Sequence, residues 1–251
     1  MTPPAMHRPH PDRFRGSRAW LACALVALSA CASTPAGPQL SPATTPAEAG
    51  LVDIAALVPD IALDIRYAGS DNFVGSPVDG YLAAKCYLLR PAAEALARVE
   101  RALRTQRLRL QLFDCYRPVR AVAHFVRWAG DLSDQRMKPR FYPDLDKRAL
   151  LGDYIAPVSG HSRGATVDLT VLQCADDGDA CVPLDMGTGF DYFGPRAHTD
   201  SPEVDARQRA NRERLRAAMT AQGFRNYPLE WWHYTLAPEP TPGTQYDVPV
   251  R

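Results

Sequence analysis

The apolar residues of the chain follow two periodicities from about Leu51 onward. Residues 91–105 and 118–130 carry alanine, leucine and valine at helical spacing, and a proline opens each segment, where it suits the first turn of a helix. Residues 107–114 alternate charged and apolar side chains, and residues 165–172 combine apolar with β-branched residues, as strands do. These patterns predict two amphipathic helices and two strands.

The remaining segments place further elements in a mixed order. Residues 204–222 have the pattern of an arginine-rich helix, and residues 229–236 are strand-like. Residues 131–153 and 173–203 are irregular and contain few apolar runs. Because helices and strands do not alternate regularly, we expect an α+β fold: a single domain over 51–251 with a central antiparallel sheet flanked by helices.

Residues 1–30 have the organisation of a secretory signal, with a basic head, an apolar run at 20–30 and small residues before Cys31. The segment resembles a bacterial lipoprotein signal, which implies that Cys31 is lipidated and anchors a periplasmic protein to a membrane. A plain signal peptide with an incidental cysteine is the alternative. By the same resemblance, Ala32 after the cysteine favours the outer membrane. Residues 31–50 are rich in proline, alanine and threonine and are typical of a tether.

Composition narrows the class of protein further. The chain has 251 residues, of which 46% are hydrophobic and 23% charged, and this excludes a collagen-like, disordered or coiled-coil protein. The apolar run at 20–30 is about half as long as a transmembrane helix requires. Without residues 1–30, 25 Lys and Arg stand against 27 Asp and Glu, so we expect no nucleic-acid partner. Nothing in the sequence predicts a protein partner.

Four cysteines remain beyond Cys31, an even number that suits an oxidising compartment. Three pairings are possible. We favour Cys174 with Cys181, which closes a short local loop, and therefore Cys86 with Cys115. A four-cysteine zinc site is a poor alternative because the chain has no CxxC pair. Reduced, buried thiols are the other alternative.

Two short segments carry candidate metal chemistry. His161 lies in a glycine-containing turn, Asp168 follows seven residues later in a predicted strand, and Glu230 and His233 are three residues apart. His161, Asp168 and His233 would supply the three ligands of a catalytic zinc, and Glu230 would be the general base. In a regular strand Glu230 and His233 would face opposite sides, so the hypothesis requires a bend near residues 231–232. The alternatives are a solvated histidine and a Trp pair that belongs to the core.

A third candidate is Arg117, which follows a predicted strand and precedes a helix. A fixed cation at such a position can stabilise an oxyanion that develops during acyl transfer. The simpler interpretation is an ion pair with Asp114. The sequence alone leaves both interpretations open.

Together these motifs resemble the bacterial D-alanyl-D-alanine dipeptidases, a group of zinc D,D-peptidases that share a fold with Hedgehog signalling domains. The likeness covers most of residues 60–250, and a set of motifs in a fixed order carries it. These are Tyr67-Ala-Gly-Ser-Asp-Asn-Phe73, Pro77-Val-Asp-Gly-Tyr81, Tyr116-Arg-Pro118, His161-Ser-Arg-Gly164, Gly187-Thr-Gly-Phe-Asp191 and Leu229-Glu-Trp-Trp-His-Tyr234.

The resemblance implies one zinc ion per chain, held by His161, Asp168 and His233. It implies that Glu230 is the catalytic base and that Arg117 binds the scissile carbonyl oxygen. The expected activity is hydrolysis of D-alanyl-D-alanine to two D-alanine molecules in cell-wall peptide turnover.

The same resemblance assigns the substrate contacts. Tyr67 and Ser159 would hold the carboxylate of the dipeptide, Asp191 its ammonium group, and Phe125 would line the pocket. A carboxylate that pairs with a free ammonium disfavours acylated peptides, which predicts a dipeptidase. The sequence departs from the family in its anchor and tether, in its four additional cysteines and in Gly160 before the first histidine. A D,D-carboxypeptidase acting on wall peptides and a non-catalytic zinc-dependent binding module are the alternatives.

Overall fold

A six-stranded sheet forms the centre of the computed structural model, which describes residues 37–175 and 180–251. Its strand order is β3-β5-β6-β9-β8, and β7 pairs with β6. Neighbouring strands are antiparallel except β3, which is parallel to β5. The strands are β3 (Ala62–Leu63), β5 (Leu108–Asp114), β6 (Thr166–Cys174), β7 (Cys181–Pro183), β8 (Phe224–Asn226) and β9 (His233–Leu236). The chain is therefore α+β, with a sheet that is antiparallel apart from one edge strand.

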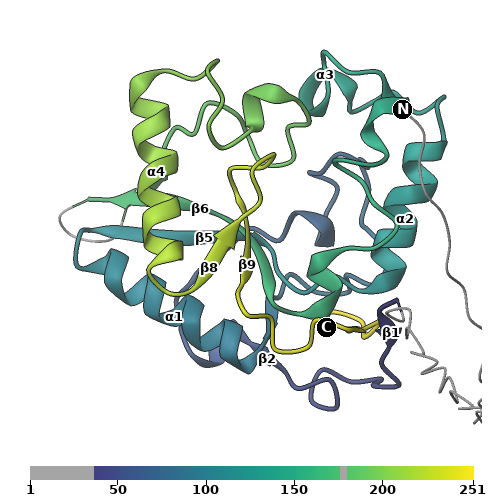
Figure 1. Ribbon diagram of the computed structural model, residues 1–251, viewed down its shortest axis with the longest axis horizontal. Coiled ribbons are helices and arrows are strands. Elements are labelled where there is room, and N and C mark those ends of the chain that lie inside the picture. The colour runs from purple at the N-terminus through teal and green to yellow at the C-terminus, as the bar shows by residue number, and fades with distance from the viewer. Residues whose placement is uncertain (1–36, 176–179) are drawn as a thin grey trace, which may run out of the picture. The chain divides into compact units, whose positions relative to one another are not determined.

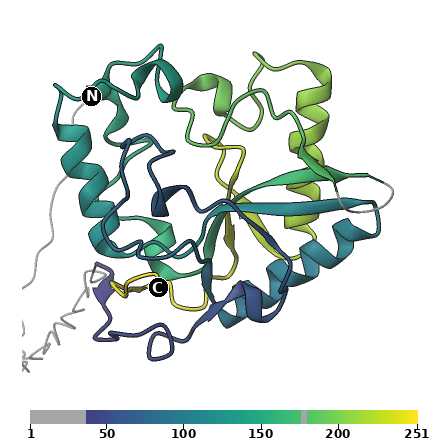
Figure 2. The same cartoon turned by 180° about the vertical axis from the view of Figure 1, so that it is seen from behind.

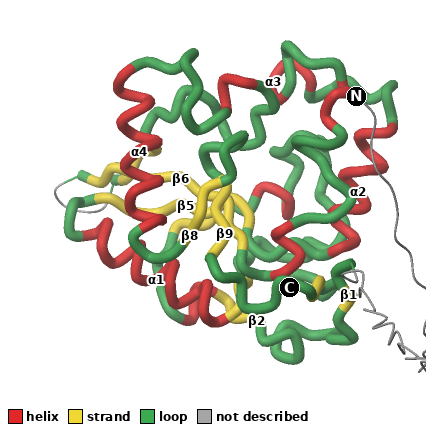
Figure 3. The backbone as a smooth tube through the Cα atoms, viewed as in Figure 1, coloured by secondary structure: helices red, strands yellow, loops and turns green. Residues whose placement is uncertain are grey.

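Four α-helices accompany the sheet in the described part of the chain. α1 packs against β5 and α4 against β8, and the two helices lie side by side, away from α2 (Figures 1 and 2). Loops make up most of the half that contains α2 and α3 (Figure 3). None of these helices combines the length and the apolar character that crossing a bilayer requires. The helices are α1 (Arg90–Arg104), α2 (Val119–Gly130), α3 (Lys138–Phe141) and α4 (Ala206–Thr220).

Local sequence explains where the two long helices begin. Pro91 occupies the first turn of α1, where its missing N–H costs nothing. α4 starts with a capping box in which Asp205 and Gln208 each accept a hydrogen bond from the other's backbone N–H. These helix starts agree with the pattern of apolar residues to within two positions.

The two ends of the described chain meet in a small sheet of their own. β1 (Gln39–Leu40) runs parallel to β10 (Thr244–Gln245), and Ala49 is buried. The structure therefore differs from the tether expected over 31–50, because residues 39–50 pack against the domain. The backbone N–H groups of Gln39 and Ser41 donate to carbonyls of the C-terminal segment, which composition alone does not reveal. Residues 1–36, including Cys31 and the predicted signal, lie outside the described residues.

The segment expected as a strand over 229–236 is a strand only from His233 onward. The N–H of Glu230 donates to the carbonyl of Tyr227, and the N–H of His233 donates to the carbonyl of Glu230. These two bonds fold residues 227–232 into consecutive turns. The Trp pair at 231–232 is buried within the core, as the simpler interpretation predicted.

Both disulfides of the structure have the pairing that the sequence favours. Cys86 is bonded to Cys115, and Cys174 is bonded to Cys181. The first joins the residue before β4 (Tyr87–Leu89) to the residue after β5. The second joins the last residue of β6 to the first residue of β7. β4 itself pairs with β2 (Leu51–Asp53).

Gly164 closes the turn that leads into β6, and it has a φ of 76°. A Cβ at this position would lie 2.9 Å from a methyl group of Leu51. We expect Gly164→Ala to lower the free energy of unfolding by about 1–3 kcal/mol, because alanine is strained in the left-handed region. Gly130→Ala is the control, since a Cβ there meets nothing within 4 Å. Equal urea midpoints for the two variants would contradict this prediction.

Candidate metal centre and active site

His161 is presented by a single 3-10 turn, Gly160–Arg163, directly before β6. The Oγ of Ser159 accepts a hydrogen bond from the N–H of His161 at 3.2 Å and caps the turn. Gly164 reverses the chain so that Asp168, on β6, returns to the imidazole. The turn and its glycine thus bring Asp168 back towards His161 within eight residues of chain.

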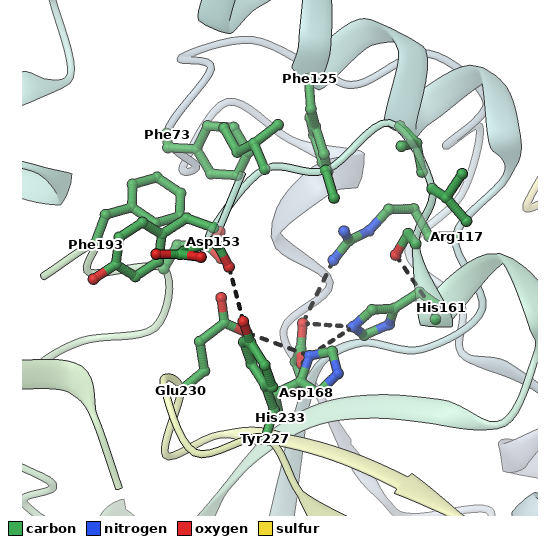
Figure 4. Close-up of a pocket in the computed structure, with 18 of the residues that line it drawn as sticks. Phe73, Arg117, Phe125, Asp153, His161, Asp168, Phe193, Tyr227, Glu230 and His233 are labelled. Carbon is green, nitrogen blue, oxygen red and sulfur yellow. Dashed lines mark hydrogen bonds and ion pairs between the residues drawn. The ribbon is translucent and has the colours of Figure 1, made fainter. Parts of the chain in front are cut away.

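Strand register supplies the rest of the site. Asp168 on β6 is paired with Asp114 on β5 and with His233 on β9. Side chains of directly paired residues lie on the same face of a sheet, so the three form a row across three strands. Two of its members, Asp168 and His233, face the side chain of His161 (Figure 4).

Three side chains in this row and turn converge on one point. The Nε2 atom of His161 lies 3.2 Å from Oδ2 of Asp168 and 3.2 Å from Nδ1 of His233. The Nδ1 atom of His233 lies 3.1 Å from Oδ1 of Asp168. The ligand atoms of all three residues fall within 4.8 Å of one another, which suits a single metal ion.

The hydrogen bond on the far side of His161 orients its ring for a ligand. The carbonyl of Cys115 lies 2.7 Å from Nδ1 of His161. Because a carbonyl only accepts, Nδ1 carries the proton, and the lone pair of Nε2 faces Asp168 and His233. The buried Oδ1 of Asp168 has no hydrogen bond of acceptable geometry among the described residues. A buried carboxylate oxygen without a donor, beside two imidazoles, fits a divalent cation.

The charges of the site point the same way. Burial raises the pKa of Asp168, but the two imidazoles outweigh this effect and hold it below its usual value. Burial lowers the pKa of His233, but Asp168 and Glu230 outweigh it and raise the pKa to about 9. Among the described residues that line the cavity, Arg117 is the only lysine or arginine, against four carboxylates. A bound cation would offset the negative charge of Asp168 and Glu230 beside the two imidazoles.

Arg117 is held rigidly at the edge of the metal site. Both Nε and a terminal nitrogen lie 2.9 Å from Oδ2 of Asp114, and the same nitrogen is 3.6 Å from Oδ2 of Asp168. Its guanidinium carbon lies 5.2 Å and 5.0 Å from the ring centres of Tyr67 and Phe125. Arg117 therefore pairs with Asp114, as the simpler interpretation predicted, and it also lines the cavity, where the oxyanion role stays a prediction.

Glu230 reaches the same cavity from the turn before β9. Its Oε2 lies 3.3 Å from Nδ1 of His233, and its side chain is 12% exposed. Because residues 227–232 form turns and not a strand, Glu230 and His233 can point the same way (Figure 4). The bend that the sequence hypothesis required is present.

The remaining predicted residues line a cavity of about 260 Å³, slightly smaller than most sites for drug-sized ligands. Asp191 is buried at 5% exposure with a φ of 60°, and its carboxylate accepts hydrogen bonds from the hydroxyl of Tyr67 at 2.9 and 3.1 Å. Burial, and next the negative charge of Asp168, raise the pKa of Asp191 well above its usual value. Phe125 and Ser159 also line the cavity.

Tyr67 lines the same cavity and contacts another of the predicted site residues. The sequence resemblance assigned it to the substrate carboxylate together with Ser159, whereas its hydroxyl is bonded to Asp191, the group expected at the ammonium. The hydroxyl of Ser159 is in turn engaged by the N–H of His161.

Several residues of the cavity were not predicted from the sequence. Phe73 and Phe193 form an aromatic wall with Phe125. Tyr227 lies opposite, and its hydroxyl donates to the carbonyl of Asp153. Phe73 ends the motif that begins at Tyr67, so the sequence offered a signal for it. The irregular loop around Asp153 has no pattern that predicts its position.

The loop that carries Asp191 is fastened by a buried arginine. Arg212 of α4 is 1% exposed and donates to the carbonyls of Met186, Arg196 and His198 at 2.6–2.9 Å. We expect Arg212→Met to lower the free energy of unfolding by about 3 kcal/mol or more, because it leaves three carbonyls without their donor. Arg214→Met, on the exposed face of the same helix, is the control. Denaturant unfolding curves that coincide for the two variants would refute the prediction.

Comparison with known proteins yields one family and several relatives. The sequence model of the D-ala-D-ala dipeptidase family matches residues 47–251. The chain is 43% identical to a D-alanyl-D-alanine dipeptidase of Streptomyces coelicolor over 195 residues, which are 77% of this chain and 95% of that protein. It is 38% identical to a D-alanyl-D-alanine dipeptidase of Enterococcus faecium over 81% of this chain and 100% of that protein. It is 34% identical to one of Escherichia coli over 74% of this chain and 84% of that protein.

Proposed function

The chain belongs to the D-ala-D-ala dipeptidase family, and on that premise we propose that it hydrolyses D-alanyl-D-alanine to two molecules of D-alanine. The observation that carries the proposal is the convergence of His161, Asp168 and His233 within 4.8 Å, with Glu230 beside them. The chain is then a metallopeptidase whose substrate is a small dipeptide.

Zinc is the cofactor that these residues suit. His161, Asp168 and His233 would hold one ion. The Asp168 oxygen that accepts no hydrogen bond of good geometry and the oriented imidazole of His161 support this choice. When bound, zinc lowers the pKa of a water molecule and polarises the scissile carbonyl. The three proposed ligands line the cavity, which leaves space beside them for the substrate.

The protein's own side chains move the protons and hold the charge. Glu230 accepts a proton from the water as its oxygen bonds to the carbonyl carbon, and later delivers that proton to the leaving amine as the C–N bond breaks. Arg117 faces the carbonyl oxygen, where negative charge develops. Asp114 keeps Arg117 in place through one hydrogen bond and a second ion-pair contact, so the cation is oriented before substrate arrives.

The substrate contacts follow from the charges at the cavity wall. Asp191 would pair with the free ammonium of the dipeptide, and the hydroxyl of Tyr67 would orient that carboxylate. Ser159 is left as the contact for the substrate carboxylate, and Phe125 bounds the pocket. An acylated amine would leave Asp191 buried without a cation, which favours a dipeptidase over a carboxypeptidase.

The cellular setting is part of the same proposal. A lipoprotein signal over 1–30 with lipidation of Cys31 would place the enzyme in the periplasm, anchored to the outer membrane, for turnover of wall peptides. The two disulfides support an oxidising compartment. We also propose that the domain shares its fold with Hedgehog signalling domains.

Two substrates distinguish the proposed activity from its alternatives. D-alanine release is measured with D-Ala-D-Ala and with an N-acetylated peptide ending in D-Ala-D-Ala. We expect cleavage of the free dipeptide and little of the acylated peptide. Preferential cleavage of the acylated peptide would indicate a carboxypeptidase, and zinc binding without cleavage of either would indicate a binding module.

A further inference from the structure

We propose that the Cys86–Cys115 disulfide is a positioning link of the metal centre, so that it sets the metal affinity as well as the stability of the fold. The proposal rests on the proposed zinc-dependent function. Cys115 belongs to the short connection between Asp114 and Arg117, and its carbonyl is the group that orients His161. One end of the covalent bond is therefore at a residue that contacts His161, directly follows Asp114 and lies two residues before Arg117.

The connection that contains Cys115 has little regular structure to hold it. The β5 ladder is irregular between Leu112 and Asp114, and residues 115–118 lie in no helix or strand. Its backbone is fastened by the N–H of Tyr116, which donates to Tyr87, and by the N–H of Arg117, which donates to His161 at 3.3 Å. A segment with so few ladder bonds gains most from a covalent attachment.

The other end of the disulfide reaches the platform that supports His161. Cys86 directly precedes β4, and its carbonyl accepts a hydrogen bond from the N–H of Ile54. At the other end of β4, the N–H of Leu89 donates to the carbonyl of Gly164 at 2.7 Å. β4 thus holds the turn of His161 on one side and, through the disulfide, the Cys115 carbonyl on the other.

Both sulfurs belong to the interior, with Cys86 at 0% and Cys115 at 2% exposure. The bond fixes the distance between β4 and the Cys115 connection, and hence the position of the carbonyl that His161 contacts at 2.7 Å. Partners of a ligating histidine tune metal affinity, and their loss typically costs 10–100-fold. The disulfide would act through this carbonyl and is not itself a ligand.

The second disulfide provides a matched control. Cys174 is six residues from Asp168 along β6, which is about 20 Å of strand, and Cys181 pairs beside it on β7. Removing either bond releases conformational freedom in the unfolded chain, so both variants should melt at lower temperature. Metal affinity of the folded protein separates a positioning role from this general effect.

The experiment compares Cys86→Ala/Cys115→Ala with Cys174→Ala/Cys181→Ala in the full chain. Zinc affinity is measured by competition with a chromophoric chelator, at a temperature where circular dichroism shows each zinc-free protein to be folded. We expect the first variant to lose tenfold or more in zinc affinity, with a fall in kcat at saturating zinc, and the second to stay within twofold of the wild type.

Zinc affinities within twofold for both variants would overturn the positioning role. If the first variant does not fold, Cys86→Ala/Cys115→Val, which refills the volume of the sulfurs, replaces it. Failure of that variant to fold at saturating zinc would also overturn the proposal, because the bond would then serve the fold as a whole. A wild-type protein that neither binds zinc nor cleaves D-Ala-D-Ala would instead refute the proposed function.

Discussion

Glu230→Ala is expected to bind zinc as the wild type does and to lose kcat for D-Ala-D-Ala by about 10²–10⁴-fold. The carboxylate is the group placed to accept the proton of the attacking water, 3.3 Å from Nδ1 of His233. Two backbone hydrogen bonds hold the turn that carries it, from the N–H of Glu230 to the carbonyl of Tyr227 and from the N–H of His233 to the carbonyl of Glu230, and the substitution leaves both intact. The loss should therefore appear in turnover and not in metal content.

Glu230→Gln sharpens this test because it retains the size and polarity of the side chain but cannot serve as a base. Glu94→Ala, an exposed carboxylate on α1, controls for the loss of a negative charge elsewhere. Metal content is read by mass spectrometry and turnover by D-alanine release. Loss of zinc from Glu230→Ala, or turnover near that of the wild type, would refute the assignment of the base.

Asp191→Ala is expected to lower kcat/KM for D-Ala-D-Ala by about 30-fold or more, the effect of truncating one partner of a buried charge pair. Asp191 is buried, and among the described residues its hydrogen-bond donor is the hydroxyl of Tyr67. The free ammonium group of the dipeptide would give this carboxylate a positively charged partner. An acetylated amine brings no such charge, so its cleavage should fall much less.

The ratio of the two kcat/KM values is the quantity that tests this role. Tyr67→Phe is the companion variant: it removes the donor to Asp191 but leaves the carboxylate, and it should shift the same ratio in the same direction by a smaller factor. A ratio that does not change in Asp191→Ala would show that Asp191 does not select the free amine. Zinc content in these variants should equal that of the wild type.

Local patterns were sufficient for much of the fold. The expected helices and strands at 91–105, 107–114, 118–130, 165–172 and 204–222 agree with the observed elements to within two residues. The approach of Asp168 to His161 could be predicted as well, because the two residues are seven positions apart and a glycine turn lies between them. Such features depend on neighbours in sequence, which a single sequence displays.

Features that depend on distant neighbours could not be predicted in the same way. The pairing of β1 with β10 joins segments about 200 residues apart, and nothing in the proline-rich composition of 31–50 indicates it. Residues 229–232 were expected to be part of a strand because of their apolar tryptophans, yet backbone hydrogen bonds fold them into turns. The bond from Tyr67 to Asp191 likewise requires the folded chain.

The central claim is that His161, Asp168 and His233 hold one catalytic zinc ion in a D-Ala-D-Ala dipeptidase. The most direct test adds zinc stepwise to metal-free protein while D-alanine release from D-Ala-D-Ala is followed. The account predicts no release without metal and a rise to a plateau at one zinc per chain, absent in His161→Ala. Release by the metal-free protein, or no release at one zinc per chain, would contradict it.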